Sequence, residues 1–306
     1  MSFDAEYLKQ VRLLLQLLPL INKQDCFALK GGTAINMFIR NMPRLSVDID
    51  LTYLPVEPRE IFLENITKQL ELLHENILQE YPACNVRKLY TKKNRQLFKL
   101  LISYSGASVK IEPNLVLRGT VFPVENMSLC ELAQNEFITY CRVKALSFAD
   151  LYAGKICAAL SRQHPRDLFD IKILLEEEGI TDKVRQAFVV YLSSNPRPMG
   201  ELLAPNLQDL EGVFNKEFMG MVAEECDYQH LLHCRGKLVA KIKQELTDEE
   251  RKFLLSIKLG EPDWQLLPNL KIHNLPALNW KVMNVRKMEA NKHQQAVDKL
   301  KRILEL

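Results

Sequence analysis

The feature that most constrains the fold is a pair of aspartates within a short alternating stretch, Ser46-Val47-Asp48-Ile49-Asp50-Leu51-Thr52. This alternation is typical of a strand, in which successive side chains point to opposite faces. Asp48 and Asp50 would then share one face and repel each other, and Asp is uncommon in strands. A divalent cation such as Mg²⁺, which binds carboxylates together with substrate phosphates, would stabilise the pair. The alternative is a solvated polar face on an edge strand.

The residues upstream favour the metal site over that alternative. Gly31-Gly32-Thr33 follows a short apolar run, Phe27–Lys30, and precedes a helix start. Glycines allow the backbone to approach a ligand closely, and the free N–H groups of a helix start favour phosphate. Thr33 adds a hydroxyl donor. A tight turn with a Thr N-cap explains the motif alone, but with the carboxylate pair it predicts a triphosphate site beside a metal site.

A third carboxylate is available in the stretch from Val109 to Asn114, which also alternates. Its polar face carries Lys110 and Glu112. If this strand lies beside the aspartate strand, Glu112 completes a three-carboxylate site that can hold two ions. Two ions stabilise both the attacking and the leaving oxygen of a phosphoryl displacement. An ordinary solvent-facing glutamate remains the alternative.

The rest of the chain predicts a two-domain α+β protein. The 306 residues carry a net charge of +3 with 47% hydrophobic and 26% charged residues, which excludes bulk disorder and a surface uniformly coated with basic residues. Before the boundary near residue 145 we expect a mixed sheet with helices, and after it almost only helices. The expected strands are 46–53, 86–90, 97–104 and 108–115; the expected helices are 4–22, one starting at Thr33, 59–79, 148–161, 166–178, 182–192, about 222–246, 248–257 and 284–304.

Cysteine usage and the N-terminus indicate a cytoplasmic protein. The seven cysteines are scattered without a CxxC pair, so neither a disulfide framework nor a zinc site is indicated. No signal peptide is recognisable, and the apolar run 11–21 is too short and too interrupted to cross a bilayer. We therefore expect no membrane association. The oligomeric state is left open.

The helix predicted at 148–161 contains a lysine on an apolar face. Lys155 has Leu151 and Ala159 one turn away, and an unpaired ammonium is costly there. It either extends to solvent or reaches an anion such as a nucleotide phosphate. A Lys155→Met change keeps the aliphatic stem, so we expect weaker NTP binding with an unchanged or slightly raised melting temperature. A large loss of melting temperature would instead indicate that Lys155 is a structural ion-pair partner of Asp170. In the next helix, the helix dipole explains an acidic residue at Asp167, which lies in the first turn. Asp170 lies one turn later, where the dipole does not explain it, and it could meet Lys155 across the helix pair.

Together these motifs resemble those of the AbiEii/AbiGii toxin family of nucleotidyltransferases, which is similar to the MenT toxins and has the polymerase-β-like nucleotidyltransferase fold. The resemblance covers most of the chain. It is carried by Leu29-Lys30-Gly31-Gly32-Thr33-Ala34, by Arg44-Leu45-Ser46-Val47-Asp48-Ile49-Asp50-Leu51, and by Lys155 with Arg162 and Arg166-Asp167-Leu168-Phe169-Asp170. One departure is Gly-Gly-Thr where many nucleotidyltransferases carry Gly-Ser; the change is mild, because Thr also offers a hydroxyl.

The resemblance implies transfer of a nucleoside monophosphate from an NTP, with Mg²⁺ or alternatively Mn²⁺, to an RNA acceptor such as the 3′ end of tRNA. It implies a nucleotidyltransferase domain at 1–145 and a helical domain at 146–306 that contributes Lys155 and Asp170 to the site. The catalytic residues would be Asp48, Asp50, Lys155 and Asp170; the metal ligands Asp48, Asp50 and Glu112; and the nucleotide-binding residues Lys30, Gly31, Gly32, Thr33, Ser46, Lys155 and Arg166. A cognate antitoxin is a possible partner. A non-catalytic NTP-binding regulatory module and nucleotidylation of a protein or small molecule remain alternatives.

A basic stretch from Val86 to Lys99 contains six cationic and no acidic residues, interleaved with aromatic ones. Such a hairpin suits RNA contact, although a solvated hairpin tip explains it almost as well. The candidate RNA-binding residues are Arg87, Lys88, Lys92, Lys93 and Arg95. Trp264 and Trp280 are expected to be core anchors rather than base-stacking surfaces.

Overall fold

The computed structural model describes residues 3–92, 95–222 and 226–306. Its contacts divide the chain into two compact units. The first unit covers Met1–Ser147 and Met219–Glu225, and the second covers Phe148–Phe218 and Cys226–Leu306. The sequence did not predict that the chain returns to the first unit near residue 219.

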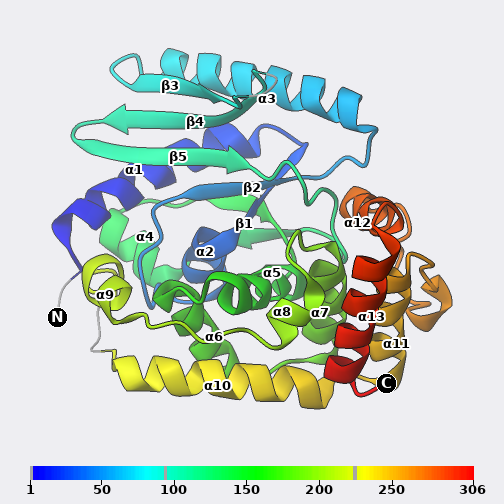
Figure 1. The fold of residues 1–306 in the computed structure, drawn as a ribbon. Coiled ribbons are helices and arrows are strands. Elements are labelled where there is room, and N and C mark those ends of the chain that lie inside the picture. The colour runs from blue at the N-terminus through cyan, green and yellow to red at the C-terminus, as the bar shows by residue number, and fades with distance from the viewer. Residues whose placement is uncertain (1–2, 93–94, 223–225) are drawn as a thin grey trace. The chain divides into compact units, whose positions relative to one another are not determined.

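The first unit is built on a mixed sheet in which the described residues form seven strands in the order β3-β4-β5-β2-β1-β7-β6 (Figure 1). The pairs β2–β5 and β1–β7 are parallel and the other neighbours are antiparallel. The expected α+β architecture with a mixed sheet is confirmed. The strands are β1 (Phe27–Lys30), β2 (Ile49–Tyr53), β3 (Asn85–Tyr90), β4 (Leu97–Tyr104), β5 (Ala107–Pro113), β6 (Glu125–Ser128) and β7 (Arg142–Ala145).

The helices of the first unit cover one face of this sheet. α3 packs against β4 and α1 packs against β5, and both helices are amphipathic. Alternate residues of β5, Val109 and Ile111, are fully buried on the covered face, whereas Lys110 and Glu112 point to the opposite face. The helices are α1 (Ala5–Asn22), α2 (Gly31–Ala34), which continues as a π-helical turn at Ile35–Ile39, α3 (Arg59–Glu80) and α4 (Glu131–Phe137).

The late segment of the first unit is tied to its beginning by backbone contacts. Leu45 N–H donates to the Met221 carbonyl at 2.7 Å, and Arg44 forms an antiparallel bridge with Val222. Asp4 N–H donates to the Gly220 carbonyl at 3.0 Å. The loop that leads to Asp48 is therefore held by residues that follow much of the helical unit in the sequence.

The second unit is helical, as the sequence predicts. α5 packs on both α6 and α7, and α7 also contacts α11 and α12. The elements are α5 (Phe148–Arg162), α6 (Pro165–Glu177), α7 (Asp182–Ser194), α8 (Met199–Leu203), α9 (Glu211–Val213) with a π-helical turn at Phe214–Phe218, α10 (Tyr228–Glu245), α11 (Asp248–Leu259), a 3-10 turn (Trp264–Leu266), α12 (Pro276–Arg286) and α13 (Ala290–Leu304). Among these and the other described helices, none is both long enough and apolar enough to cross a membrane.

Several expected elements differ in extent. The expected strand 46–53 begins only at Ile49, so Asp48 lies in the loop just before β2. The expected helix 222–246 begins at Tyr228, where Asp227 accepts a hydrogen bond from the Gln229 N–H as the N-cap. The expected helix 284–304 is two helices, because α12 ends at Arg286 and Glu289 caps α13.

Candidate functional site

The predicted site residues fall into two groups, one in each unit. The first group surrounds the turn between β1 and α2. Asp50 is the register partner of Lys30 on β1 and of Glu112 on β5, so β2 places Asp50 between them. The expectation that the Glu112 strand lies beside the aspartate strand is confirmed. Asp48 is carried by the preceding loop, and its side chain is 41% exposed.

Neighbouring atoms lie too close to both glycines of the turn for either position to carry a side chain without displacing them. Gly31 has φ +75°, and a Cβ built there would lie 2.7 Å from Asp50 Oδ2. A Cβ on Gly32 would lie 2.8 Å from Arg44 Nη2 and 2.9 Å from Ser46 Oγ. The turn thus fits against Asp50 on one side and against the loop of Arg44 and Ser46 on the other. Arg44, which is 2% exposed, is a part of this site to which the sequence assigned no role.

Thr33 holds the loop that carries Asp48. Its hydroxyl donates to the Asp48 carbonyl at 2.6 Å, and its Oγ1 lies 3.0 Å from the Ser46 Oγ. Thr33 is 1% exposed and Ser46 is also buried. Both hydroxyls lie inside the turn, where that of Thr33 fixes the backbone at Asp48; their contact with a nucleotide stays a prediction.

Two lysines on the same sheet face balance the carboxylates. Lys99 of β4 forms an ion pair with Glu112, with Nζ 2.5 Å from Oε2. Lys110 Nζ lies 3.9 Å from Asp48 Oδ1, at the limit of an ion pair. Lys99 and Lys110 were not predicted as site residues; the alternation of β4 and β5 is the signal that places them on the face of Asp50 and Glu112.

The donor set of this group fits a magnesium ion held by two carboxylates. Within residues 3–92, 95–222 and 226–306, no three His, Cys, Asp or Glu side chains are grouped as metal ligands. Glu112 is paired with Lys99 in this structure, so its role as a third ligand beside Asp48 and Asp50 stays a prediction. Mg²⁺ commonly binds one or two carboxylates and takes its other ligands from water and substrate phosphates. Asp48 and Asp50 are the residues that would hold it.

A change at Gly31 tests how tightly the turn fits Asp50. We expect Gly31→Ala to lower the melting temperature more than Gly106→Ala does. Both glycines have positive φ, at which a side chain costs about 1–2 kcal/mol, but nothing lies within 4 Å of a Cβ on Gly106. The difference between the variants in thermal unfolding reports the displacement of Asp50. Equal melting temperatures would contradict the contact.

The second group is a buried ion cluster between α5 and α6. Lys155 Nζ lies 2.9 Å from Asp167 Oδ1 and 2.9 Å from Asp170 Oδ2. Arg162 adds a bidentate pair to Asp167, with Nε 2.5 Å from Oδ2 and Nη2 2.9 Å from Oδ1. Lys155 is 6% exposed, and both aspartate side chains are fully buried. The expected meeting of Lys155 and Asp170 is confirmed, and the solvent-extended conformation of Lys155 is wrong.

Asp167 is the member of this cluster that sequence reasoning missed. Its place in the first turn of α6 gave a sufficient local reason for an acid, but it is also the residue that both cations contact. Burial alone would raise the pKa of Asp167, but the charges of Lys155 and Arg162 outweigh burial and hold the pKa well below its ordinary value. Asp167 is therefore ionised at neutral pH.

The start of α6 carries the remaining predicted residue, Arg166. The His164 ring nitrogen Nδ1 accepts the Arg166 N–H at 3.2 Å as an N-cap, and Pro165 occupies the first helical position. The Arg166 side chain is half-buried. Burial and the nearby charge of Arg166 lower the pKa of His164, so its imidazole is neutral at neutral pH.

Comparison with known proteins identifies the family of this chain. Residues 12–282 match the model of the nucleotidyl transferase AbiEii toxin family, described as a type IV toxin–antitoxin system. No curated protein matches the sequence. The match spans both groups of site residues, from the Gly31 turn to Lys155 and Asp170.

Solved structures agree with this assignment at the level of the fold. The chain is similar to MenT4, a nucleotidyltransferase toxin from Mycobacterium tuberculosis H37Rv, with a TM-score of 0.61 and 15% identity over 92% of this chain and 95% of that chain. Terminal uridylyl transferase 4 from Trypanosoma brucei with bound GTP aligns at 12% identity over 100% of this chain and 92% of that chain. Its TM-score of 0.34 is too low to support an argument.

Proposed function

Because the chain belongs to the AbiEii nucleotidyl transferase toxin family, we propose that it transfers a nucleoside monophosphate from an NTP to a hydroxyl of RNA, with the 3′ end of tRNA as the acceptor. The acceptor hydroxyl oxygen bonds to the α-phosphorus and releases its proton to solvent, the bond from the α-phosphorus to the oxygen that bridges to the β-phosphate breaks, and pyrophosphate leaves. Mg²⁺, bound by Asp48 and Asp50, would stabilise charge on the phosphates. The family also implies a cognate antitoxin.

The residues of the turn position this chemistry. Gly31 lets the turn approach Asp50 closely, and Thr33 fixes the backbone at Asp48, so the segments that carry the two carboxylates are positioned before any ligand binds. Such preorganisation contributes to catalysis, because it costs no reorganisation at the moment of reaction. Lys99 and Lys110 supply positive charge on the same face, where phosphates would lie.

The observation that most favours an RNA acceptor is that exposed basic residues extend along the sheet face on which Asp50 and Glu112 lie. Arg87 on β3, Leu101 on β4 and Lys110 on β5 are register partners across neighbouring strands, on the face that carries Asp50 and Glu112. Arg87 and Lys110 are exposed. A strand of RNA that follows these cations towards Asp50 would meet the metal site at its end.

The candidate RNA-binding residues do not all belong to this path. Lys88 points to the opposite face and forms an ion pair with Glu71 on α3, so we remove it from the set. Lys92 and Arg95 are exposed at the hairpin tip. Lys93 lies outside the described residues.

The experiment that tests the function is direct labelling. Purified protein is incubated with total RNA, Mg²⁺ and each labelled NTP in turn, with chelator and ribonuclease controls. We expect label in RNA of tRNA size with one preferred NTP, lost on chelation. If the label survives ribonuclease, the acceptor is a protein or a small molecule and not RNA. No label with any NTP would leave only NTP binding, which is the alternative that the sequence left open.

A charge variant tests the acceptor path. We expect the Arg87→Gln, Lys92→Gln, Arg95→Gln protein to have a KM for RNA raised by about tenfold and an unchanged KM for NTP. Each lost phosphate contact also reduces the slope of log affinity against log salt by about 0.7 for single-stranded RNA. Lys88→Gln is the matched control, because Lys88 faces Glu71. Equal RNA kinetics in the triple variant and the control would contradict the path.

We also propose a cytoplasmic location, where NTPs and tRNA are found. All seven cysteines lie in the described part of the chain, and none forms a disulfide. Burial raises the pKa of the Cys26 thiol to about 11, so this residue stays protonated at neutral pH. Reduced cysteines of this kind are typical of cytoplasmic proteins.

A further inference from the structure

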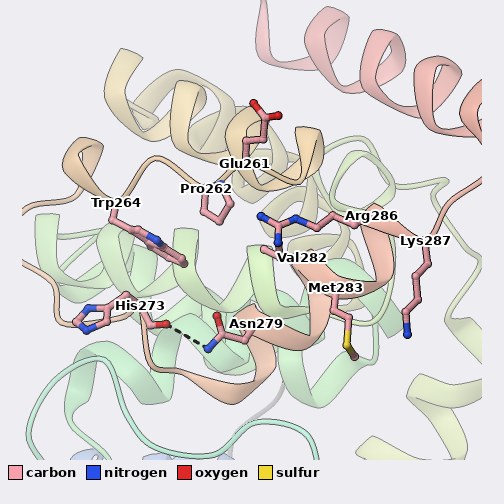
Figure 2. Close-up of a pocket in the computed structure, with 9 residues that line it drawn as sticks. All are labelled: Glu261, Pro262, Trp264, His273, Asn279, Val282, Met283, Arg286 and Lys287. Atoms are coloured by element: carbon pink, nitrogen blue, oxygen red, sulfur yellow. Dashed lines mark hydrogen bonds between the residues drawn. The ribbon is translucent and has the colours of Figure 1, made fainter.

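The second unit contains a groove that the proposed chemistry does not use. It has a volume of about 820 Å³ and is formed by the segment after α11, the 3-10 turn and α12 (Figure 2). The groove is separate from the Lys155 cluster within this unit, since α7 packs both on α5 and on α11 and α12. A volume of this size suits a small ligand or one nucleotide of a longer chain.

One wall of the groove is aromatic. The Trp264 ring packs on the buried Phe253 ring with centroids 5.9 Å apart, and the indole projects into the groove (Figure 2). Trp264 is half-buried, so part of its surface is available to a ligand. Trp280, nearby on α12, is 42% exposed. The expectation that Trp264 and Trp280 are core anchors is therefore wrong for Trp280 and incomplete for Trp264.

The opposite side of the groove is cationic. Arg286 is held in place, because its Nε donates to the Gly260 carbonyl at 2.7 Å and its Cγ would lie 3.1 Å from a Cβ on Gly260. Among the described residues no partner is found for the two terminal amino groups of this guanidinium. Lys287 adds a second, exposed cation, whereas Glu261 is the one acid among the described residues that line the groove.

We propose that this groove binds an unpaired nucleotide of an RNA strand, with its base against Trp264 and its phosphate against Arg286 and Lys287. Base stacking on an aromatic ring and phosphate pairing with arginine are the two interactions that single-stranded nucleic acid uses. The Asn279 amide, which also lines the groove, offers hydrogen bonds to a base edge. The proposal deepens the proposed function and rests on it for the identity of the ligand as RNA.

The composition of the groove favours this occupant over an apolar peptide. An apolar helix would match the apolar part of the lining, which includes Val282 and Met283. It would leave the charges of Arg286 and Lys287 without partners, whereas a nucleotide supplies a phosphate to them. A free NTP shares the chemistry of the nucleotide and is distinguished only by experiment. An acidic peptide could satisfy the cations but would leave the Trp264 face without a stacking partner.

Trp264 itself provides the signal for the test. In a Trp280→Phe background, which leaves Trp264 as the one tryptophan, fluorescence is titrated with a single-stranded oligonucleotide of RNA, with NTP, with duplex RNA and with an acidic peptide. We expect saturable quenching by single-stranded RNA and about tenfold weaker binding after Lys287→Gln. Lys301→Gln is the matched control, because it removes an exposed lysine from α13. Melting temperatures of all variants verify the fold.

Each outcome decides the proposal. If RNA does not quench the Trp264 fluorescence of the folded protein, the proposal that the groove binds RNA is overturned, even if RNA is still labelled in the transfer reaction. Quenching by NTP or by the acidic peptide but not by RNA also overturns it. If Lys287→Gln and Lys301→Gln weaken RNA binding equally, the binding depends on overall charge and the proposed site is overturned. Specific quenching without any transfer to RNA would support the groove and contradict the proposed function instead.

Discussion

Lys155→Met is expected to lower the free energy of unfolding by about 3–5 kcal/mol, the usual cost of removing one partner from a buried ion pair. The methionine keeps the aliphatic stem, so packing is preserved. What is lost is the positive charge that contacts two fully buried carboxylates, those of Asp167 and Asp170. The sequence alone favours an unchanged or slightly raised melting temperature, and it leaves a large loss as the sign of a structural ion pair with Asp170.

Denaturant unfolding measures this effect, and Lys172→Met on the same helix as Asp167 is its control. Lys172 makes an exposed ion pair with Glu176, four residues along the chain, and such pairs contribute at most about 1 kcal/mol. If Lys155→Met and Lys172→Met had the same unfolding free energy, the buried cluster would not stabilise the second unit.

The same cluster predicts how stability depends on pH. The pKa of Asp167 is lower in the folded than in the unfolded protein, so its contribution to stability is complete above the ordinary pKa of 3.8. It is lost as the pH falls from there through the depressed folded pKa. Lys155→Met removes a cause of the depression, and we therefore expect the unfolding free energy of this variant to fall less below pH 3.8 than that of the unchanged protein.

Asp50→Asn is expected to reduce nucleotide transfer by about a thousandfold or more and to leave the melting temperature unchanged. A metal ion contributes several kcal/mol to a phosphoryl transfer, and each 1.36 kcal/mol is a factor of ten in rate. Asn keeps the shape that fits against Gly31 but removes one of two neighbouring negative charges, so the fold is not weakened. The measurements are the transfer rate and the affinity for Mn²⁺ in the absence of NTP.

Asp25→Asn is the control for this change, because Asp25 lies in the same unit and is fully exposed in its pair with Lys144. Near-normal transfer by the Asp50 variant, or unaltered Mn²⁺ affinity, would remove Asp50 from the metal site. Loss of transfer with a large fall in melting temperature would instead assign it a structural role.

The sequence predicted those parts of the fold that depend on local pattern. Alternation placed Glu112 on the face of Asp50, and the observed register of β2 and β5 agrees. It missed β6, β7 and α4, which are short and lack a strong period. It also extended the aspartate strand too far, because the loop from Ser46 to Asp48 owes its conformation to Thr33 rather than to strand pairing.

Contacts between distant residues limited the prediction of the site. The pair of Lys99 and Glu112 depends on the register of β4 against β5, which no single motif encodes. Asp167 had a sufficient local explanation as a first-turn acid, so its contacts with Lys155 and Arg162 gave no separate signal. When a local effect such as the helix dipole already explains a residue, the sequence gives no sign of its contacts with distant residues.

The bridge between Arg44 and Val222 has a consequence for synthesis on the ribosome. The loop that carries Asp48 is anchored by Leu45 to the Met221 carbonyl, and that residue is made only after α5, α6 and α7. A nascent chain that ends before this point has both proposed metal ligands, Asp48 and Asp50, but lacks the anchor of the loop that carries Asp48. For a toxin of this family, we expect this order to keep the proposed site incomplete until most of the polypeptide has been translated.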